Sequence, residues 1–114
     1  MRSDRERLYD ILNCIAAVER YSKRGREAFD SDELVQGWMV LNVMTLGEAA
    51  SKVSQLTRTR FPDVPWGQMI GMRNRLVHDY ISINHDIVWN VVEHELLALK
   101  SVIEDAIAAL NAVP

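Results

Sequence analysis

The chain of 114 residues has little of several residue types that mark particular protein classes. It contains one cysteine, Cys14, together with three prolines and five glycines. A single cysteine excludes an intramolecular disulfide and a metal site built from several thiolates. Because Cys14 lies within a helical apolar pattern, we predict that it is a small packing residue rather than a reactive thiol.

The sequence also lacks a long hydrophobic run. No apolar segment approaches the ~18 residues that a membrane-spanning helix needs. The first ten residues, MRSDRERLYD, are rich in charge and unlike a signal peptide. We therefore expect a cytoplasmic protein without a membrane partner.

A surplus of basic charge is missing as well, since the formal net charge is −3. A protein that coats long stretches of nucleic acid usually carries a positive surplus, so a broad electrostatic nucleic-acid binder is disfavoured. The charge is nevertheless uneven. Residues 51–75 have five basic side chains against one acidic, a net charge of +4, and residues 76–114 have one against six, a net charge of −5. This pattern fits either a local basic site or ordinary solvated faces.

Apolar residues make up 48% of the chain, and most of them recur with helical spacing. The spacing predicts helices over residues 5–23, 32–57, 66–80 and 85–110, and it leaves open whether the last one bends near residues 96–98. Ser3 and Glu6 form a capping-box pattern, Asp30 and Glu33 offer a second start signal, and Asn84 is a suitable N-cap. The two prolines in residues 58–65 predict a non-helical connector there.

No segment alternates with period two for long enough to predict a strand. The sequence therefore predicts an all-α fold, an antiparallel four- to five-helix bundle forming one domain over residues 1–114. The apolar stripe of the helix expected over 32–57 is unusually broad, because Leu34, Trp38 and Leu41 widen it. That breadth predicts burial on more than one side, as in a bundle that forms a homodimer through this helix and the last one.

Polar and ionisable side chains gather in the helix predicted over residues 66–80. Arg73 and His78 are five residues apart and flank a common sector, and Asn74 and His78 are neighbours at a spacing of four. Histidine titrates near neutral pH, and arginine binds a phosphate through parallel hydrogen bonds. These residue types suit RNA cleavage by attack of the 2′-hydroxyl, which needs no metal ion and no protein nucleophile. A chance cluster on a surface helix, with Asn74 and His78 simply hydrogen-bonded, is the alternative.

The motif Arg73-Asn74-Arg75-Leu76-Val77-His78-Asp79-Tyr80 resembles that of the HepT-like toxins, which belong to the HEPN superfamily. The flanking segments resemble that family too. They are Phe61-Pro62-Asp63-Val64-Pro65-Trp66, Gly71-Met72, Gly47-Glu48-Ala49-Ala50 and Asp86-Ile87-Val88-Trp89. The resemblance covers about residues 5–110, and the motif positions show no departure from the family pattern.

The resemblance implies a HEPN-like helical fold and a homodimer whose motif helices face each other across a cleft. It implies a metal-independent endoribonuclease of a type VII toxin–antitoxin system, with Arg73 and His78 as catalytic residues, RNA as substrate and no cofactor. It also implies a minimal nucleotidyltransferase antitoxin (MntA-type) that transfers AMP to Tyr80. Without the resemblance, Tyr80 is equally readable as a packing residue.

Two residues near the motif have open roles. Glu48 lies in an apolar helical stretch and, if buried, needs a cationic partner or a proton, so it is a candidate partner for an arginine of the motif helix. Arg75 either adds phosphate affinity or is merely solvated, and Asn74 is a supporting candidate. The alternative function is a non-catalytic HEPN module that binds nucleotide or a partner and acts with a minimal nucleotidyltransferase.

Overall fold

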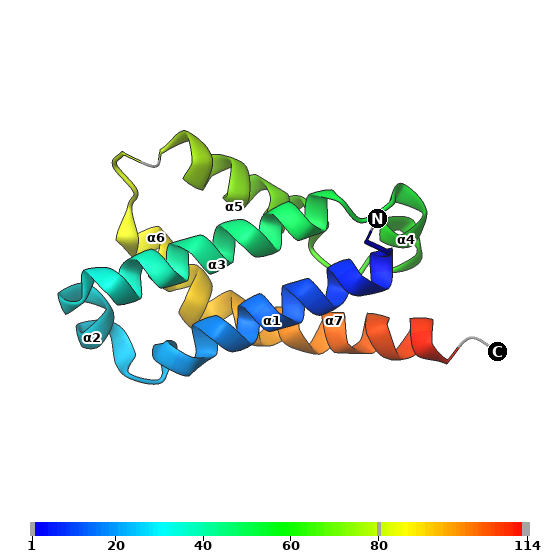
Figure 1. Cartoon of the computed structure of the whole chain (residues 1–114), viewed down its shortest axis with the longest axis horizontal. Helices are drawn as coiled ribbons and strands as arrows, with labels where there is room; N and C mark the ends of the chain where they lie inside the picture. Colours follow the sequence, from blue (N-terminus) through cyan, green and yellow to red (C-terminus); the bar gives the residue numbers. More distant parts are fainter. Residues whose placement is uncertain (1, 80, 113–114) are drawn as a thin grey trace.

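The computed structural model describes residues 2–79 and 81–112, and over these ranges the chain is helical with no strand. The predicted all-α bundle is therefore confirmed. Figure 1 shows α3 lying between α5 and α1, while α7 runs along the far side of α1. The apolar core lies mainly between α1, α3 and α7, and α5 packs on α3. None of the described helices is both long and apolar enough to cross a bilayer.

The first helix, α1 (Asp4–Ser22), starts where the capping box predicts. Ser3 Oγ accepts from the Glu6 amide at 3.1 Å, and Glu6 accepts from the Ser3 amide at 3.1 Å. The buried stripe of α1 repeats every three or four residues and consists of Leu8, Ile11, Cys14, Ile15 and Val18. These side chains face the core, as expected for an amphipathic helix.

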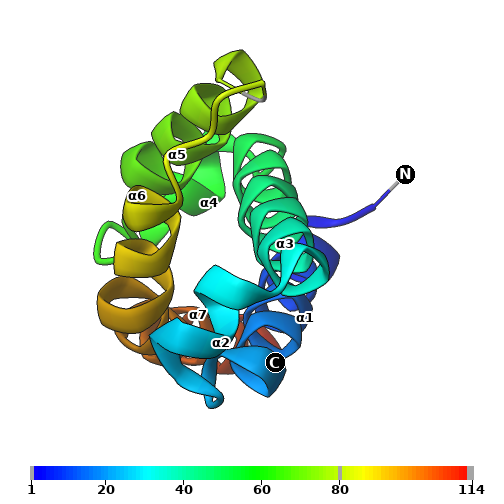
Figure 2. The same ribbon diagram turned by 90° about the vertical axis from the view of Figure 1, so that its left-hand side faces the viewer.

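A short helix that the sequence analysis did not predict, α2 (Gly25–Ser31), follows α1. Gly25 begins this helix at a φ of +86°, a left-handed conformation that glycine adopts without strain. The chain reverses there, and α2 places Phe29 fully inside the core, where its ring centroid lies 5.2 Å from that of Trp89. Figure 2 shows α2 covering one end of the bundle.

The predicted helix over 32–57 is two helices, α3 (Glu33–Ser51) and α4 (Gln55–Arg60). Asp32 caps α3 by accepting from the Leu34 and Val35 amides, so the cap lies two residues beyond the Asp30 expected from sequence. Ser54 caps α4, whose residues 58–60 fall in the predicted connector. Arg58 donates to the Ser51 and Val53 carbonyls at 2.7 and 3.0 Å, which satisfies the end of α3 and stabilises the break.

The motif helix, α5 (Trp66–His78), ends two residues before the expected end. The last predicted helix is present as α6 (His85–Asn90), a π-helical turn η1 (Val91–Glu95) and α7 (Leu96–Asn111). Asn84 caps α6 as predicted, through the Asp86 and Ile87 amides. The question of a bend near residues 96–98, which the sequence left open, is answered by the π turn directly before them, which adds an extra residue to the helix.

Candidate active site

The predicted site residues lie on two helices: Arg73, Asn74, Arg75 and His78 on α5, and Glu48 on α3. Successive α-helical residues turn by about 100°, so Arg73 and His78 lie about 140° apart around the axis, with Asn74 between them. Arg73 is half-buried on the side that faces α3, whereas Asn74 and His78 are exposed. The three side chains thus span a sector of about 140°, from Arg73 on the side that faces α3 to His78 on the open side of the helix.

The guanidinium of Arg73 is held by two contacts. Its Nε lies 3.0 Å from Glu48 Oε2 of α3 in an ion pair, and its Nη1 donates to Asn74 Oδ1 at 2.9 Å. Among the described residues, Nη2 has no hydrogen-bond partner. Two of the arginine's three nitrogens are therefore fixed by the protein, and the third is available to an anion such as a phosphate.

The expected pairing of Glu48 with a motif arginine is confirmed. Its side chain is 42% exposed, so the pairing does not arise from burial. The second carboxylate oxygen, Oε1, lies 3.5 Å from Lys52 Nζ, one turn further along α3. One carboxylate thus joins two cations at the α3–α5 contact, and this local group carries a net charge of +1.

His78 is the last residue of α5 and is exposed. No described residue forms a hydrogen bond or ion pair with it, so its imidazole is open to solvent and to a ligand. The alternative in which Asn74 simply pairs with His78 is not what the structure has, because Asn74 Oδ1 accepts from Arg73 instead.

Arg75 does not join this cluster. It lies about 160° around the helix from Arg73, and its Nε is 3.9 Å from Asp79 Oδ2 in an exposed pair. Exposed pairs of this kind contribute little to stability. Tyr80, the candidate modification site, lies outside the described residues.

Gly47 belongs to the site but was not predicted as a site residue from the sequence. A Cβ built at this position would lie 2.4 Å from Arg73 Cβ and 2.6 Å from the Met69 carbonyl oxygen. Only glycine therefore allows α3 to approach α5 this closely. The available signal was a glycine in the middle of a helix, directly before a charged residue, where its helix-weakening effect needs a packing reason. The same reasoning does not apply to Gly37, which has open space around it.

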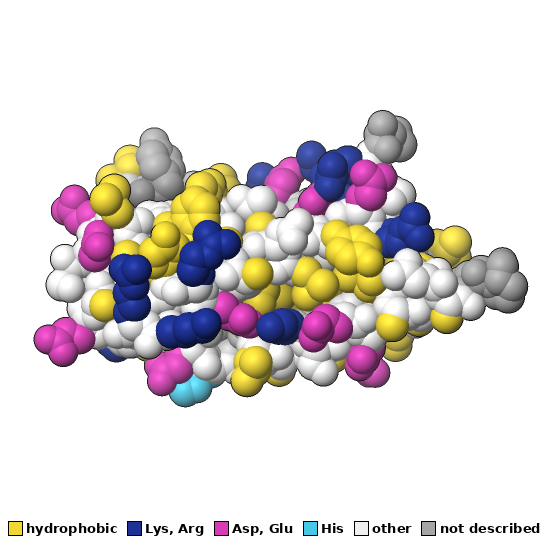
Figure 3. All heavy atoms as spheres, turned by 60° about the horizontal axis from the view of Figure 1, so that its bottom comes forward, with side chains coloured by type: hydrophobic (Ala, Val, Ile, Leu, Met, Phe, Trp, Pro, Cys, Tyr) yellow, Lys and Arg dark blue, Asp and Glu magenta, His cyan; other side chains and the backbone are white. Residues whose placement is uncertain are grey.

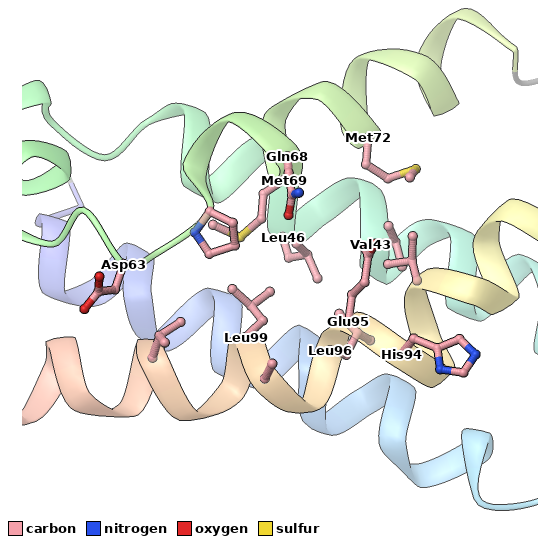
Figure 4. A pocket seen from close by; sticks show the side chains of 14 residues that line it. Val43, Leu46, Asp63, Gln68, Met69, Met72, His94, Glu95, Leu96 and Leu99 are labelled. Atoms are coloured by element: carbon pink, nitrogen blue, oxygen red, sulfur yellow. The ribbon is translucent and has the colours of Figure 1, made fainter.

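A separate apolar cavity of about 390 Å³ lies on the other flank of α5, between α5, α3 and the η1–α7 segment. Figure 4 shows Met69 and Met72 of α5 on one side and Leu96 and Leu99 on the other, with His94 at its edge. Arg73 and His78 do not line it. The cavity and the motif cluster are therefore different places on the molecule.

Charge elsewhere on the surface is mixed. Figure 3 shows the side formed by α1 and α7, where basic and acidic side chains are interspersed with apolar ones. This face lacks the single-sign field that a broad nucleic-acid surface needs. Within the described part of the chain, no three His, Cys, Asp or Glu side chains come together as a metal-ligand group.

The fold and the cluster define a class of protein: a small helical bundle that presents an arginine and a histidine on one exposed helix flank, with the arginine anchored by a neighbouring helix. The family model "Ribonuclease HepT-like" matches residues 11–106. The chain belongs to the HepT-like ribonuclease family, consistent with a HEPN-type helical bundle.

Relatives match over most of their length. The chain is 30% identical over 98 residues to "Putative RNase MJ1380" of Methanocaldococcus jannaschii, covering 85% of this chain and 90% of the relative. It is 27% identical over 104 residues to "Probable ribonuclease HepT" of Thermococcus cleftensis, covering 90% and 94%. It is 28% identical over 116 aligned positions to "mRNA nuclease HepT" of Shewanella oneidensis, covering 75% and 87%. No solved structure matches significantly.

Proposed function

We propose that this protein is the toxin of a type VII toxin–antitoxin system and cleaves cellular RNA as an endoribonuclease. The observation that carries the proposal is the Arg73 guanidinium, which Glu48 and Asn74 hold at 3.0 and 2.9 Å beside an open His78. The cluster lies in a chain of the HepT-like ribonuclease family, one of whose relatives is named an mRNA nuclease. RNA is accordingly the proposed substrate.

Arg73 binds the scissile phosphodiester. A guanidinium forms short, charge-assisted hydrogen bonds to phosphoryl oxygens and opposes the negative charge that builds on them in the transition state. The contacts to Glu48 and Asn74 fix the plane of the group before substrate arrives. A preoriented donor does not have to reorganise during the reaction, and this is the main way in which such a group lowers the barrier.

His78 moves the protons. The 2′-hydroxyl oxygen attacks phosphorus while a neutral His78 accepts its proton, and the bond from phosphorus to the 5′-oxygen breaks. A protonated His78, supplied by the second protomer of a dimer, donates a proton to the leaving 5′-oxygen. The products are a 2′,3′-cyclic phosphate and a 5′-hydroxyl. The nucleophile belongs to the RNA, so the reaction needs no metal ion and no nucleophilic side chain.

The dimer that completes this scheme uses the outer stripe of α3. Leu34, Trp38 and Leu41 are 84%, 37% and 55% exposed, and they recur at spacings of four and three along one face. The same face continues through Thr45 to Glu48, beside Arg73. A second copy that covers these apolar side chains therefore brings its own motif close to the first. On α7, the exposed large apolar side chain is Leu97 alone, so α3 is the better candidate.

The regulatory partner in this proposal is a minimal nucleotidyltransferase antitoxin that transfers AMP to Tyr80. An adenylyl group on Tyr80, two residues beyond His78 in the sequence, adds a bulky anion, and its phosphate competes with RNA for Arg73. Substrate binding is then blocked by both charge and volume. Asn74 supports the site through its bond to Arg73, and Arg75 adds long-range attraction for RNA from the opposite flank.

RNA cleavage by the purified protein tests the proposal. Bacterial total RNA and a fluorogenic single-stranded RNA oligonucleotide of mixed sequence serve as substrates, with EDTA present throughout. We expect cleavage that leaves cyclic phosphate ends, and rates reduced by about 100-fold or more in Arg73→Ala and His78→Ala. Arg20→Ala and His94→Ala, which change exposed side chains on other elements, serve as matched controls and should retain activity.

Three results would contradict this proposal: no cleavage by the wild type, cleavage only when a divalent cation is added, or full activity of His78→Ala. The alternative function, a nucleotide- or partner-binding HEPN module, predicts the first result together with binding of a nucleotidyltransferase. Induced expression in a bacterial host, with and without such a partner, distinguishes a toxin from a binding module.

A further inference from the structure

We propose that the edge of α3 formed by Gly47, Glu48 and Lys52 is a wall of the RNA site. In this "α3 wall", Gly47 allows α5 to pack closely against α3, and Glu48 is a positioning residue that sets the direction of the Arg73 side chain. Lys52 binds a second phosphate of the RNA strand whose first phosphate is bound by Arg73. The inference rests on the proposed function, because it assigns a substrate contact and a positioning role within that site.

The first part of the wall is a close approach of two helices. The atoms that a Gly47 side chain would meet are the Cβ of Arg73 and the backbone carbonyl oxygen of Met69. Neither atom can rotate away, since each is fixed by the α5 backbone. Any side chain at position 47 must therefore displace α5, and with it the base of the Arg73 side chain.

The second part is the carboxylate of Glu48. Its Oε2 lies 3.0 Å from Arg73 Nε, and its Oε1 lies 3.5 Å from Lys52 Nζ. The pair is partly exposed, with 35% of the Arg73 side chain and 42% of the Glu48 side chain accessible, so its contribution to stability is small. Its effect is on orientation: with Nε and Nη1 already occupied, Nη2 is the guanidinium nitrogen that has no partner among the described residues.

The third part is Lys52. Its side chain is 50% exposed, and its 3.5 Å contact with Glu48 is longer than an optimal charge-assisted hydrogen bond. An ammonium group on a flexible stem exchanges such a contact for a phosphate readily. Because Lys52 and Arg73 contact the same carboxylate, the two cations lie near each other. We infer that an RNA strand with one phosphate on Arg73 places a neighbouring phosphate within reach of Lys52.

Steady-state kinetics with the fluorogenic RNA oligonucleotide separate the two roles. Loss of positioning in Glu48→Ala should lower kcat by about tenfold or more, because a small misplacement of a catalytic group costs up to ~100-fold in rate. The KM should change much less. In Lys52→Gln the KM should rise several-fold with kcat unchanged. Glu104→Gln on α7 and Lys23→Gln after α1 remove the same charges from exposed positions elsewhere and should match the wild type.

Binding provides a readout that does not require cleavage. A fluorescent 2′-deoxy oligonucleotide has the phosphates but lacks the attacking hydroxyl, and its affinity can be measured against salt concentration. Removing one phosphate contact reduces the slope of log affinity against log salt by about one. We expect that reduction in Lys52→Gln and not in Lys23→Gln.

The role of Gly47 is tested by comparing its alanine variant with that of Gly67. Gly47→Ala should shift α5 and lower kcat even where circular dichroism shows a folded helical protein. Gly67→Ala, in α5 itself, meets nothing within 4 Å and should retain activity. The side-chain Nε–H resonance of Arg73 in NMR spectra should move in both Gly47→Ala and Glu48→Ala, and it stays unchanged in Gly67→Ala.

Different results would contradict the α3 wall and the proposed function. If Arg73→Ala is inactive while Glu48→Ala has the wild-type kcat and Lys52→Gln has the wild-type KM and salt slope, RNA cleavage stands and the α3 wall is wrong. If the wild type does not cleave RNA, the proposed function is wrong. The Arg73 resonance and the salt slope of deoxy-oligonucleotide binding then still decide whether Glu48 orients Arg73 and Lys52 binds phosphate.

Discussion

The two most reactive kinds of side chain in this protein, a thiol and an imidazole, have opposite surroundings. Cys14 is 7% exposed in the core stripe of α1, and His78 is exposed at the end of α5. Burial, with a smaller effect from the charge of Asp10, raises the pKa of the Cys14 thiol to about 11. The thiol therefore stays protonated at neutral pH, when only the thiolate is a good nucleophile.

This difference predicts the behaviour of Cys14 towards thiol reagents. In the folded protein at pH 7.5, a chromogenic disulfide reagent should react with Cys14 at least about 100-fold more slowly than with the same chain in denaturant, because both access and thiolate fraction are low. The absorbance of the thiolate that the reagent releases measures the rate of the reaction with Cys14. Rapid stoichiometric labelling of folded protein would show that Cys14 is a reactive thiol and not a packing residue.

Among the helices, the first and the fourth are tied by one carboxylate. Asp4, in the first turn of α1, accepts from the Ser54 amide at 3.0 Å, from Ser54 Oγ at 2.5 Å and from Thr57 Oγ1 at 2.6 Å. Partial burial alone would raise the pKa of Asp4. The hydrogen bonds from Ser54 and Thr57 outweigh that effect, and the pKa is lowered.

A lowered pKa in the folded state predicts a pH dependence of stability. The contribution of Asp4 is complete above the unfolded pKa of about 3.9 and is lost as pH falls through the lower folded value. We expect Asp4→Asn to reduce the free energy of unfolding by about 1 kcal/mol at pH 7, the net worth of a hydrogen bond. Urea unfolding of the wild type and of Asp4→Asn measures the difference in the free energy of unfolding at pH 7 and near pH 3. A difference that persists unchanged at the lower pH would contradict this role.

Two helices could be predicted from sequence to within two residues: α1, which begins at a capping box, and α5, which has no side-chain cap but follows Pro65. Ser3, Glu6 and Asn84 form local hydrogen bonds, so their signals lie in neighbouring residues. The break between α3 and α4 was not predicted, although Ser54 caps α4 locally. It is stabilised by Arg58, which donates to the Ser51 and Val53 carbonyls, and by Asp4, which lies 50 residues earlier than Ser54. The short helix α2 was missed because the contacts that bury Phe29, with the rings of Trp89 and His85, are long-range.

The same distinction applies to the candidate site. The nearness of Arg73 and Asn74 follows from helix geometry, and so does the flank they share with His78. The pairing of Glu48 with Arg73 was one of the options that the sequence left open. The role of Gly47 could not be read from sequence, because it depends on which face of α3 meets α5. A periodic pattern shows that a face is buried, but it does not show which helix buries it.

At the scale of the whole molecule, the exposed apolar stripe of α3 predicts a dimer that can be dissociated by one charge. Leu41→Glu places a carboxylate in the middle of the stripe and should convert the protein to a folded monomer with little RNA cleavage. Leu97→Glu adds the same charge at the exposed leucine of α7 and should leave both dimer and activity intact. Light scattering at micromolar concentration measures the mass. A wild-type monomer, or a dimer that Leu41→Glu does not weaken, would contradict this interface.

The last prediction concerns control of the whole dimer through Tyr80. Attachment of AMP adds a phosphodiester, which carries negative charge, and an adenine ring close to Arg73 and His78 in sequence. The proposed RNA site depends on a small net positive charge, that of Arg73 and Lys52 against Glu48, so one added anion removes most of its attraction for phosphate. Modified protein should therefore bind the deoxy-oligonucleotide weakly while its thermal unfolding stays unchanged and it remains a dimer.

Intact-mass analysis of protein co-expressed with a minimal nucleotidyltransferase tests this switch. We expect one or more adenylyl units on the peptide that contains Tyr80, and none on that peptide in Tyr80→Phe. Tyr9→Phe is the matched control, because Tyr9 is 43% exposed on α1, away from the motif helix. Since phenylalanine keeps the ring and loses only the hydroxyl, Tyr80→Phe should remain an active ribonuclease that the nucleotidyltransferase cannot silence. If the co-expressed protein is silenced without any added mass, the partner acts by covering the site, and the adenylylation step is wrong.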